Sequence, residues 1–325
     1  MSKIMQKSRI LLTGATGFVG PRLLKALRKS NFCDAEIFVW TYGPDSAASS
    51  DPLNIDIRCR DAVFKSIALI KPTHIIHLAA QSHVPTSFSQ PELTWDINVK
   101  GSLHLFEAVK KYVPTAGILH ISSSEVYGSS FQTGEPVTES ALLQPQNPYA
   151  ASKAATDLMA GQYGAQGMKI IRMRPFNHVG PGQSEDFVIS SFAAQIARIE
   201  NGQQPAILHV GNLDAFRDFL SVDDVVQAYL LVLQKLPELP AGLVLNICSG
   251  VPRKIKDILD SLISYASCPI DIEIDPTRIR PSDTPIATGV NSAAKHYLAW
   301  QPQIEFETTL LQILNDWRRK VGGKR

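Results

Sequence analysis

The 325-residue sequence has no long apolar run and little net charge. No apolar stretch reaches the roughly 18 residues that a membrane span needs. Ile10–Leu12, which follows a basic start, is too short for the apolar core of a signal peptide. Lys and Arg total 32 against 30 for Asp and Glu, without a dense basic run, so the charge gives no support for binding to nucleic acid or an anionic membrane. We therefore expect a cytoplasmic protein with neither partner.

Cysteine is also scarce. The four cysteines, Cys33, Cys59, Cys248 and Cys268, lie far apart, and no pair has a CxxC or metal-ligand spacing. In a cytosolic protein this pattern predicts four reduced and mostly buried thiols. No cluster of His, Cys or Asp has the spacing of metal ligands, so no metal site is expected.

The chain is long for one hydrophobic core, because single cores stop growing at roughly 250–300 residues. In the first half, short apolar runs alternate with longer helical patterns, which is typical of βαβ units and a parallel sheet. Strands are predicted at Arg9–Thr13, Glu36–Trp40, His74–Leu78, Gly117–Ile121 and Lys169–Arg174, and helices at Pro21–Ser30 and around Thr94–Tyr112. We predict an α/β fold with a Rossmann-like, doubly wound parallel sheet over residues 1–175.

After Pro175 the pattern changes, beginning with a loop that contains Gly and Pro over Phe176–Ser184. Helices are predicted at Phe187–Glu200, Val222–Gln234 and Glu307–Lys320, a strand at Val244–Ile247 and an edge strand at Ile270–Arg280. This half predicts a smaller C-terminal α/β substrate-binding domain over residues 176–325. Residues 218–250 are expected to fold back onto the first domain.

Three glycines, Gly14, Gly17 and Gly20, lie between the first predicted strand and the first predicted helix. Glycine allows a tight turn and the close approach of a pyrophosphate to the backbone. The helix N-terminus then offers unpaired N–H groups to the phosphates. The spacing alone is weak, but the strand before it and the helix after it are the context that the motif requires. We predict a dinucleotide site here, with Thr16, Phe18 and Val19 as further contacts.

The end of the second predicted strand, Trp40–Gly43, has neither an acid for a ribose 2′-hydroxyl nor an Arg for a 2′-phosphate. The choice between NADH and NADPH is therefore open, and use of both fits the sequence. Asp56 and Ile57 follow one strand and one loop later. Asp56 is either a contact of the adenine or an ordinary loop acid.

Asn147, Pro148 and Tyr149 have the pattern of a helix start, with Asn as the N-cap and Pro at the first helical position. Tyr149 and Lys153 then lie at i and i+4 on one face of that helix. A tyrosine phenol normally titrates too high for acid–base work near neutrality, and a neighbouring ammonium is expected to lower its pKa. After a dinucleotide loop and a strand that ends in Ser122–Ser124, this pair predicts catalysis.

With the glycine loop, the Tyr149–Lys153 pair, Leu78–Gln81, Asn98 and Ser123, the chain resembles the extended short-chain dehydrogenase/reductase family over essentially its whole length. The resemblance implies that Ser123 hydrogen-bonds the reacting carbonyl and that Tyr149 passes the proton. Lys153 would bind the nicotinamide-ribose hydroxyls and lower the pKa of the tyrosine. Asn98 would support the active-site end of a helix. The cofactor path would include Leu78, Ala79 and Ala80.

Three segments, Ser122–Gly128, Arg174–Gln183 and Val210–Phe219, further resemble GDP-sugar-modifying members of this family. This resemblance implies that Asn177 holds the sugar diphosphate. Arg217 and Arg280 would neutralise its phosphates, a role that suits guanidinium groups because they pair bidentately with phosphate oxygens. Ser124 and Glu125 are further predicted substrate contacts. His83, on a loop at the carboxyl edge of the sheet, is either a substrate contact or a packing residue.

The implied reaction is the NAD(P)H-dependent reduction of the C4 keto group of a GDP-4-keto-6-deoxyhexose, forming GDP-D-rhamnose or the 6-deoxytalose epimer. The alternative is a GDP-mannose 4,6-dehydratase or a nucleotide-sugar 4-epimerase that retains its cofactor. Glu125 does not decide between them, since dehydratases use this Glu to abstract a proton and the reductases also tend to carry it. Ser123 in place of Thr favours the reductase.

Two further departures from the dehydratases favour the reductase. Phe18 and Val19 occupy the positions of a typical Gln-Asp pair, and Trp40–Ser50 lacks their Arg-rich insertion. A non-catalytic dinucleotide sensor on the same fold would have no need for an intact set of Ser123, Tyr149 and Lys153.

The family resemblance also implies a homodimer, joined through a four-helix seam. The helices near Asn98–Lys111 and Tyr149–Tyr163 would form it. The apolar residues Leu103, Phe106 and Leu158 are its expected contacts.

Overall fold

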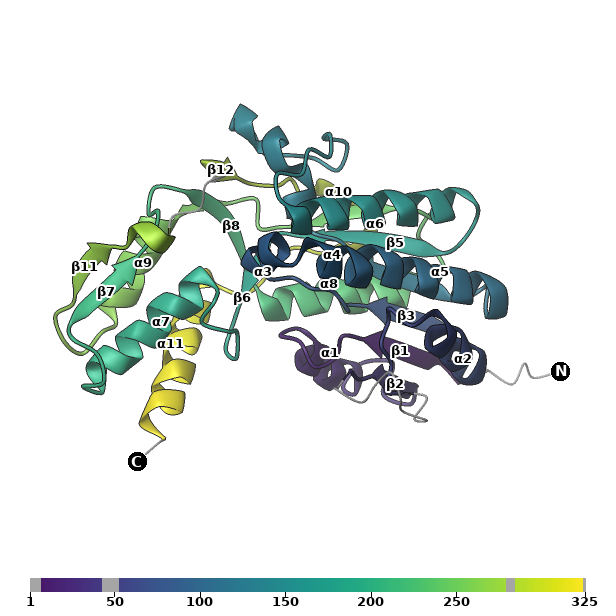
Figure 1. The fold of residues 1–325 in the computed structure, drawn as a ribbon, viewed down its shortest axis with the longest axis horizontal. Coiled ribbons are helices and arrows are strands. Elements are labelled where there is room, and N and C mark those ends of the chain that lie inside the picture. The colour runs from purple at the N-terminus through teal and green to yellow at the C-terminus, as the bar shows by residue number, and fades with distance from the viewer. Residues whose placement is uncertain (1–6, 43–52, 279–283, 324–325) are drawn as a thin grey trace.

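A computed structural model describes residues 7–42, 53–278 and 284–323. Its larger lobe is built on a six-stranded sheet in the order β2-β1-β3-β4-β5-β9, in which all neighbouring strands are parallel (Figure 1). The strands are β1 (Arg9–Thr13), β2 (Glu36–Trp40), β3 (His74–His77), β4 (Gly117–Ile121), β5 (Ile170–Pro175) and β9 (Val244–Ile247). The predicted Rossmann-like α/β fold is confirmed.

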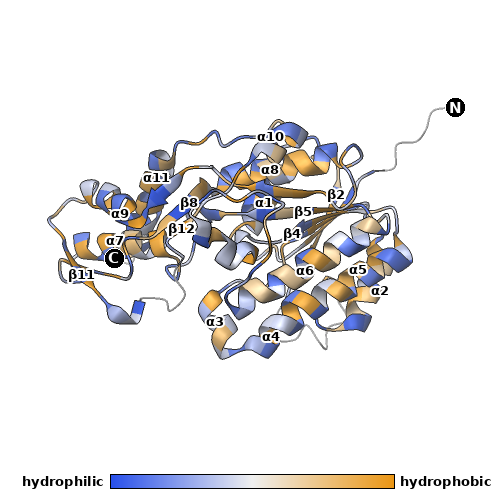
Figure 2. Ribbon diagram, turned by 90° about the horizontal axis from the view of Figure 1, so that it is seen from above, coloured by the Kyte–Doolittle hydropathy of each residue, from blue (hydrophilic) through white to orange (hydrophobic). Residues whose placement is uncertain are grey.

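Helices cover both faces of this sheet because its strands alternate apolar side chains between two cores. Ile10, Leu12 and Ile76 face α1 (Gly20–Leu27), α8 (Val222–Lys235) and α10 (Ser292–Leu298). Leu11 and Ile75 face the opposite way. The helices on that side are α2 (Arg60–Ile70), α5 (Gly101–Tyr112) and α6 (Pro148–Ala165). Figure 2 shows α8 and α10 on one side of the strands and α5 and α6 on the other.

The helix predicted around Thr94–Tyr112 is divided into three parts. After α3 (Val84–Ser89), the chain forms α4 (Pro91–Trp95), a π-helical turn η1 (Asp96–Lys100) and then α5. Ser102 donates a hydrogen bond to the Asn98 carbonyl, and such side-chain bonds to the preceding turn distort helices. Asn98 therefore lies at a local widening of the helix.

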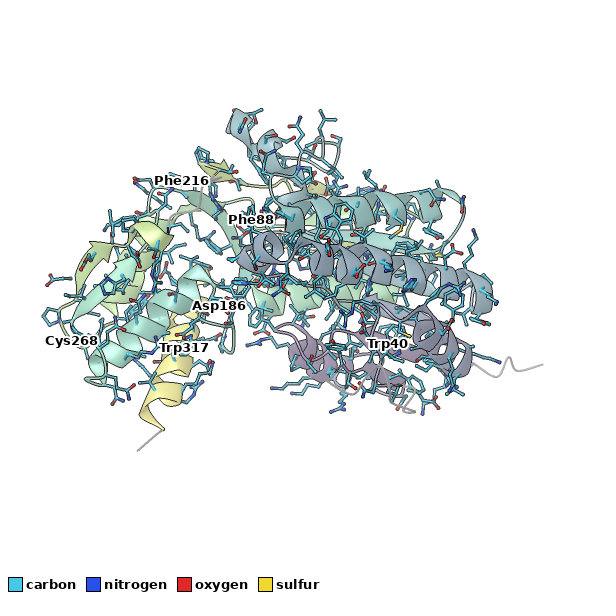
Figure 3. The ribbon with its side chains drawn as sticks, in the orientation of Figure 1. Trp40, Phe88, Asp186, Phe216, Cys268 and Trp317 are labelled. Atoms are coloured by element: carbon cyan, nitrogen blue, oxygen red, sulfur yellow. The ribbon has the colours of Figure 1, made fainter. Side chains whose placement is uncertain are left out.

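The smaller lobe contains two short sheets and three helices around a separate core. One sheet contains β6 (Asn177–Val179), β8 (Phe216–Ser221), β10 (Pro252–Lys254) and β12 (Ile286–Ala287), and the other contains β7 (Ile207–Val210) and β11 (Asp271–Ile274). The helices are α7 (Val188–Glu200), α9 (Ile255–Ser264) and α11 (Phe306–Gly322). Cys268 and Trp317 lie in this lobe and Trp40 in the sheet lobe (Figure 3).

Several sequence predictions need correction. The loop predicted over Phe176–Ser184 contains the strand β6, which pairs with β8. The predicted edge strand is short and exposed, since β11 ends at Ile274. Cys33 and Cys59 are exposed, so only Cys248 is fully buried among the four free cysteines. β9 joins the larger sheet and α8 packs on it, so these two later elements belong to the larger lobe. The division of the chain into two domains between residues 175 and 176 stays a proposal.

Two further segments complete the described chain. A 3₁₀ segment η2 (Ser124–Thr133) follows β4, and a single 3₁₀ turn η3 (Pro276–Arg278) follows β11. No helix in residues 7–42, 53–278 and 284–323 is both long and apolar enough to cross a membrane.

Candidate active site

A cavity of about 1820 Å³ lies at the carboxyl ends of the sheet strands, where the two lobes meet. Phe88 of α3 and Asp186 ahead of α7 both line it (Figure 3). The predicted residues that line it are Gly14, Thr16, Gly17, Phe18, Val19, Gly20, Asp56, Ile57, Leu78, Ala79, Ala80, His83, Ser123, Ser124, Glu125, Tyr149, Lys153, Asn177 and Arg217. Arg280 lies outside the described residues. The structure thus brings the other predicted residues together in one place.

The glycine loop has the close packing that its motif predicts. Gly14 has a φ of +71°, and a Cβ built there would lie 2.6 Å from the backbone N of Ala79. A Cβ on Gly20 would lie 2.1 Å from the carbonyl oxygen of Ala15. Gly17 is more open, since the nearest atom to its Cβ would be the Gly14 oxygen at 3.4 Å. The open Gly17 and the N-terminus of α1, where Val19 provides no side-chain cap, fit a pyrophosphate.

Arg22, in the first turn of α1, connects the glycine loop to the smaller lobe. Its guanidinium donates to the Phe18 carbonyl at 3.3 Å and to the Pro181 carbonyl. The same group lies 4.9 Å from the centre of the Phe18 ring, and that ring stacks on His178 at 6.2 Å. The sequence analysis missed Arg22, because no motif marks a contact between segments so far apart.

Near the end of β2, an ion pair lines the cavity. Asp56 accepts hydrogen bonds from the Arg58 guanidinium at 2.9 and 2.7 Å, and Arg58 also donates to the Tyr42 hydroxyl at 3.1 Å. Burial alone would raise the pKa of Asp56, but the hydrogen bonds and charge of Arg58 outweigh it and hold that pKa below its ordinary value. Asp56 is therefore an ionised group with a fixed orientation at this end of the cavity.

The start of α6 is built as predicted. Asn147 caps the helix by accepting a hydrogen bond from the Ala150 amide at 2.8 Å, and Pro148 occupies the first turn. The side-chain amide of Asn147 also donates to Glu125 at 3.3 Å. Ser123, just after β4, accepts a hydrogen bond from the Glu125 amide at 3.2 Å. Asn147 thus contacts both the first turn of α6 and the predicted acidic residue Glu125.

The protonation of Tyr149 differs from the sequence prediction. Burial raises the pKa of Tyr149 to about 12, although a hydrogen bond with Ser123 lowers it, and the charge of Glu125 raises it further. Lys153 does not depress this pKa. Its ammonium instead donates to the Ile121 carbonyl, and burial lowers the pKa of Lys153 to about 8 while the charge of Asp157 raises it. In this form of the site, the phenol keeps its proton at neutral pH.

A buried ion cluster lies one turn beyond Lys153 on α6. Asp157 accepts from Arg172 at 2.9 Å and from Arg174 at 2.7 Å. Burial alone would raise the pKa of Asp157, but the hydrogen bonds and charges of the two arginines hold it below its ordinary value. The carboxylate is therefore a permanent negative charge one helical turn from Lys153.

A chain of buried hydrogen bonds connects the glycine loop to η1. Thr13, directly before Gly14, contacts His77 Nδ1 at 2.8 Å, and His77 Nε2 contacts the Ser102 hydroxyl at 3.0 Å. Burial and the charge of Lys153 lower the pKa of His77 to about 3, so the ring is neutral. Because Ser102 donates its own proton to the Asn98 carbonyl, His77 must donate from Nε2 and accept from Thr13 at Nδ1.

The Asn98 side chain continues this connection to the catalytic helix. Its amide donates to the Ser152 hydroxyl at 2.9 Å and to the Gln81 carbonyl at 3.1 Å. Ser152 in turn donates to the carbonyl of Tyr149 at 2.7 Å. Asn98 therefore lies behind the cavity and braces the turn that carries Tyr149, as the family resemblance implies.

The other end of the cavity is lined by polar and charged residues of the smaller lobe. Asn177 is on β6, and Arg217 on β8 donates to the carbonyls of Phe216 and Thr284 at 2.8 and 2.6 Å. On the sheet lobe, in the loop before α3, His83 Nδ1 contacts the Thr86 hydroxyl at 2.8 Å. The sequence analysis missed further lining residues of the smaller lobe, among them Arg198, His209, Asn212 and Arg278. Only the segment Val210–Phe219 pointed to this part of the chain.

Comparison with known proteins identifies the family. The sequence model described as GDP-mannose 4,6 dehydratase matches residues 11–313. The chain belongs to the GDP-mannose 4,6-dehydratase family. One relative, a protein of Pseudomonas aeruginosa named GDP-6-deoxy-D-mannose reductase, is 36% identical over 96% of this chain and 98% of its own length. GDP-mannose 4,6 dehydratase 2 of Arabidopsis thaliana is 31% identical over 97% of this chain and 88% of its own length.

A solved structure of a related protein is similar to this chain in fold. The structure of RMD from Pseudomonas aeruginosa complexed with NADPH is similar with a TM-score of 0.84 and 34% identity, covering 97% of this chain and 100% of that one. The GDP-mannose 4,6-dehydratase family thus includes relatives named for reduction and relatives named for dehydration. Within the described parts of this chain, no group of three or more His, Cys, Asp and Glu side chains could hold a metal ion.

Proposed function

We propose that this chain is an NAD(P)H-dependent reductase of the C4 keto group of a GDP-4-keto-6-deoxyhexose. The observation that carries this proposal is the single cavity that contains the glycine loop, the set of Ser123, Tyr149 and Lys153, and Arg217. The similarity to the Pseudomonas aeruginosa reductase over nearly the whole of both chains supports it. The product is GDP-D-rhamnose or its 6-deoxytalose epimer, depending on the face of the sugar that receives the hydride.

The cofactor is NADPH or NADH, and the similar structure in complex with NADPH supports this class of ligand. When bound, the reduced nicotinamide supplies the hydride. The glycine loop would hold the pyrophosphate. Asp56 and Ile57 would contact the adenosine end of the cofactor, and the cofactor path would include Leu78, Ala79 and Ala80. Lys153 would hold the nicotinamide ribose through its hydroxyls.

Tyr149 acts as the general acid. With a pKa of about 12 it carries a proton at neutral pH, which it donates to the C4 oxygen as the hydride reaches C4. The resulting phenolate then regains a proton from solvent. Ser123 hydrogen-bonds the same oxygen, since its side chain is already a partner of Tyr149.

The smaller lobe would bind the nucleotide sugar. Asn177 would hold the diphosphate, and Arg217, with Arg280 from outside the described residues, would neutralise its charge. His83 and Ser124 line the part of the cavity between these residues and Tyr149 and are proposed contacts of the sugar.

Dehydration of GDP-mannose, or 4-epimerisation with a retained cofactor, is the second candidate. The contact between Asn147 and Glu125 favours it, because it holds a carboxylate beside Ser123 and Tyr149. The similarity to the Arabidopsis thaliana dehydratase also supports it.

One experiment separates these reactions. The purified protein is incubated with GDP-4-keto-6-deoxymannose and each reduced nicotinamide in turn, and with GDP-mannose alone. The proposal predicts stoichiometric oxidation of the cofactor with formation of a GDP-6-deoxyhexose. Dehydration of GDP-mannose without any cofactor oxidation in the first incubation would refute it.

We further propose that the protein is a homodimer joined through α5 and α6. Leu103 on α5 and Leu158 on α6 are 39% and 61% exposed, which leaves apolar side chains on the surface of these two helices. The prediction for Phe106 is wrong, since this residue is fully buried in the core. We expect Leu158→Arg to halve the mass measured by analytical ultracentrifugation, whereas a wild-type protein that sediments as a monomer would contradict the dimer.

A further inference from the structure

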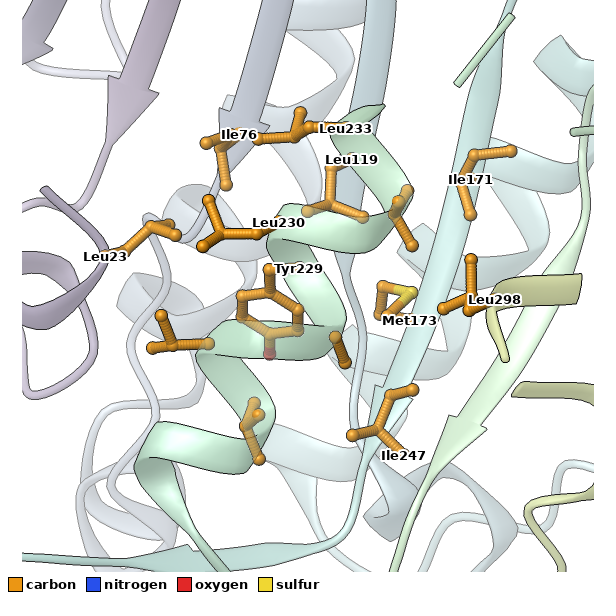
Figure 4. Packing of buried hydrophobic residues seen from close by; sticks show 14 of the residues in the cluster. Leu23, Ile76, Leu119, Ile171, Met173, Tyr229, Leu230, Leu233, Ile247 and Leu298 are labelled. Carbon is orange, nitrogen blue, oxygen red and sulfur yellow. The ribbon is translucent and has the colours of Figure 1, made fainter. Parts of the chain in front are cut away.

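Tyr229 is a buried tyrosine of α8 for which the proposed chemistry has no role. Its side chain is 1% exposed and packs in the core between α8 and the sheet, among residues such as Leu23 and Met173 (Figure 4). No described residue makes a hydrogen bond with its hydroxyl group. The oxygen is nevertheless not among the fully enclosed polar atoms that lack a partner, so it is accessible from the cavity that Tyr229 lines. The hydroxyl of Tyr229 is therefore available to a bound molecule.

The orientation of the Tyr229 ring shows where its hydroxyl points. In Figure 4 the Tyr229 oxygen points in the direction that leads along β5 from Ile171 to Met173, which is toward the carboxyl ends of the strands. Tyr229 also lines the cavity that contains the glycine loop and Lys153. The hydroxyl is thus aimed at the active site and away from the core in which the ring is packed.

Its neighbours place Tyr229 on the dinucleotide side of this cavity. Its ring belongs to the same apolar cluster as Ala15 of the glycine loop, Val19 at the start of α1 and Leu23 of α1. Burial raises the pKa of Tyr229 well above its ordinary value, and the charge of Tyr149 raises it further. Tyr229 and Tyr149 line the same cavity, and the hydroxyl of Tyr229 is neutral throughout the physiological range.

We propose that Tyr229 is a further binding residue of the dinucleotide site, whose hydroxyl donates a hydrogen bond to an acceptor oxygen of the bound dinucleotide. This inference rests on the proposed use of a nicotinamide dinucleotide and is independent of which sugar is reduced. Tyr229 joins α8, which follows the sugar-binding strand β8, to the cofactor.

The variant Tyr229→Phe removes one oxygen atom and keeps the ring. We expect the Kd for NADPH and for NADH, measured by fluorescence titration without sugar, to rise about fivefold, as for the loss of one typical hydrogen bond. The thermal stability of the unliganded variant should equal or exceed that of the wild type, because no bond within the chain is lost. The stabilisation on adding NADPH should be smaller. A hydroxyl with only a structural role would instead lower the unliganded Tm.

The matched control is Tyr127→Phe. Tyr127 is also fully buried, but its hydroxyl donates to Asn246 at 2.6 Å and accepts from Arg174 at 3.0 Å, and it does not line the cavity. This control should lose thermal stability and keep the wild-type Kd for NADPH. Unchanged affinity for both dinucleotides in Tyr229→Phe would overturn the inference. Failure of the wild type to reduce any ketosugar, with dinucleotide binding intact, would refute the proposed function alone.

Discussion

The two lobes contribute to the same cavity in different ways. On the sheet lobe, closely packed backbone forms the wall, as where Gly14 lies against Ala79, and the paired charges of Asp157 and two arginines are buried behind it. On the smaller lobe, the wall consists of side chains from short strands, loops and α7, and its ion pairs are more exposed, as for Arg198 with Glu185. The glycine-loop end of the cavity is therefore defined by backbone packing, whereas the end in the smaller lobe depends on individual side chains.

The largest expected effect concerns the catalytic tyrosine of the sheet lobe. Tyr149→Phe should lower turnover by about 10²- to 10⁴-fold, the contribution of a positioned general acid, and should leave dinucleotide binding nearly unchanged. The rate of cofactor oxidation with the ketosugar measures the first effect, and fluorescence titration measures the second. Tyr163→Phe on the same helix is the control, since Tyr163 donates its hydroxyl proton to Glu107 outside the cavity. Wild-type turnover in Tyr149→Phe would remove the catalytic assignment.

The next prediction compares the stability contributed by one ion pair from each lobe. Arg174 and Asp157 are 2.7 Å apart with side chains 4% and 0% exposed, whereas Arg318 and Glu200 are also 2.7 Å apart but 31% and 10% exposed. Asp157→Asn should lower the free energy of unfolding by about 3–5 kcal/mol because it leaves buried guanidinium charge uncompensated. Glu200→Gln should cost about 1 kcal/mol, because its arginine remains accessible to water. Chemical denaturation measures both.

The pH dependence of this comparison has a definite sign. The arginines hold the pKa of Asp157 below 3.8, so its contribution to stability is complete above that pH and is lost as the pH falls through the depressed pKa. The stability difference between wild type and Asp157→Asn should therefore be constant from neutrality to about pH 4 and shrink only at lower pH. Equal losses in the two variants would contradict the contrast between the lobes.

A third comparison uses two glycines with left-handed backbone. Gly14 has a φ of +71° and no room for a Cβ, whereas Gly202 has a φ of +68° and no atom within 4 Å of its Cβ position. Gly202→Ala should cost only the strain of the conformation, about 1–2 kcal/mol. Gly14→Ala should cost more and should also abolish dinucleotide binding, because the Ala79 backbone must move. Retained NADPH affinity in a folded Gly14→Ala protein would contradict the assignment of this loop.

The smallest effect concerns Lys153. Burial lowers its pKa to about 8, so the free enzyme loses this positive charge as the pH rises through that value. The kcat/KM for the dinucleotide, which reports the free enzyme, should therefore fall above about pH 8. A profile that stays flat to pH 10 would show that the ammonium is not needed for capture of the cofactor.

The sequence predicted those features correctly that depend on residues close together in the chain. The bounds of β1, β2 and β4 were predicted to the residue, and the N-cap at Asn147 was found, because strand periodicity and capping are encoded by neighbouring residues. Neither Arg22 nor Tyr229 was found, since each acts on a segment far away in the chain. The pKa of Tyr149 was misjudged because sequence spacing shows that Lys153 is near but does not show how deeply both groups are buried.

The chain of hydrogen bonds through Thr13, His77, Ser102 and the Asn98 carbonyl has a consequence for how this sequence can diverge. The side chains of Thr13, His77 and Ser102 each give one proton and accept one, and the chain ends on the backbone carbonyl of Asn98. Replacing any one of the three side chains by an apolar one leaves its neighbour without a partner, at a cost of about 1–3 kcal/mol. Three positions in separate stretches of the chain are thus inherited as a unit. Variation among descendants of this protein should keep these three side chains together or exchange them together, which makes the group a covariation signature rather than three independent conserved sites.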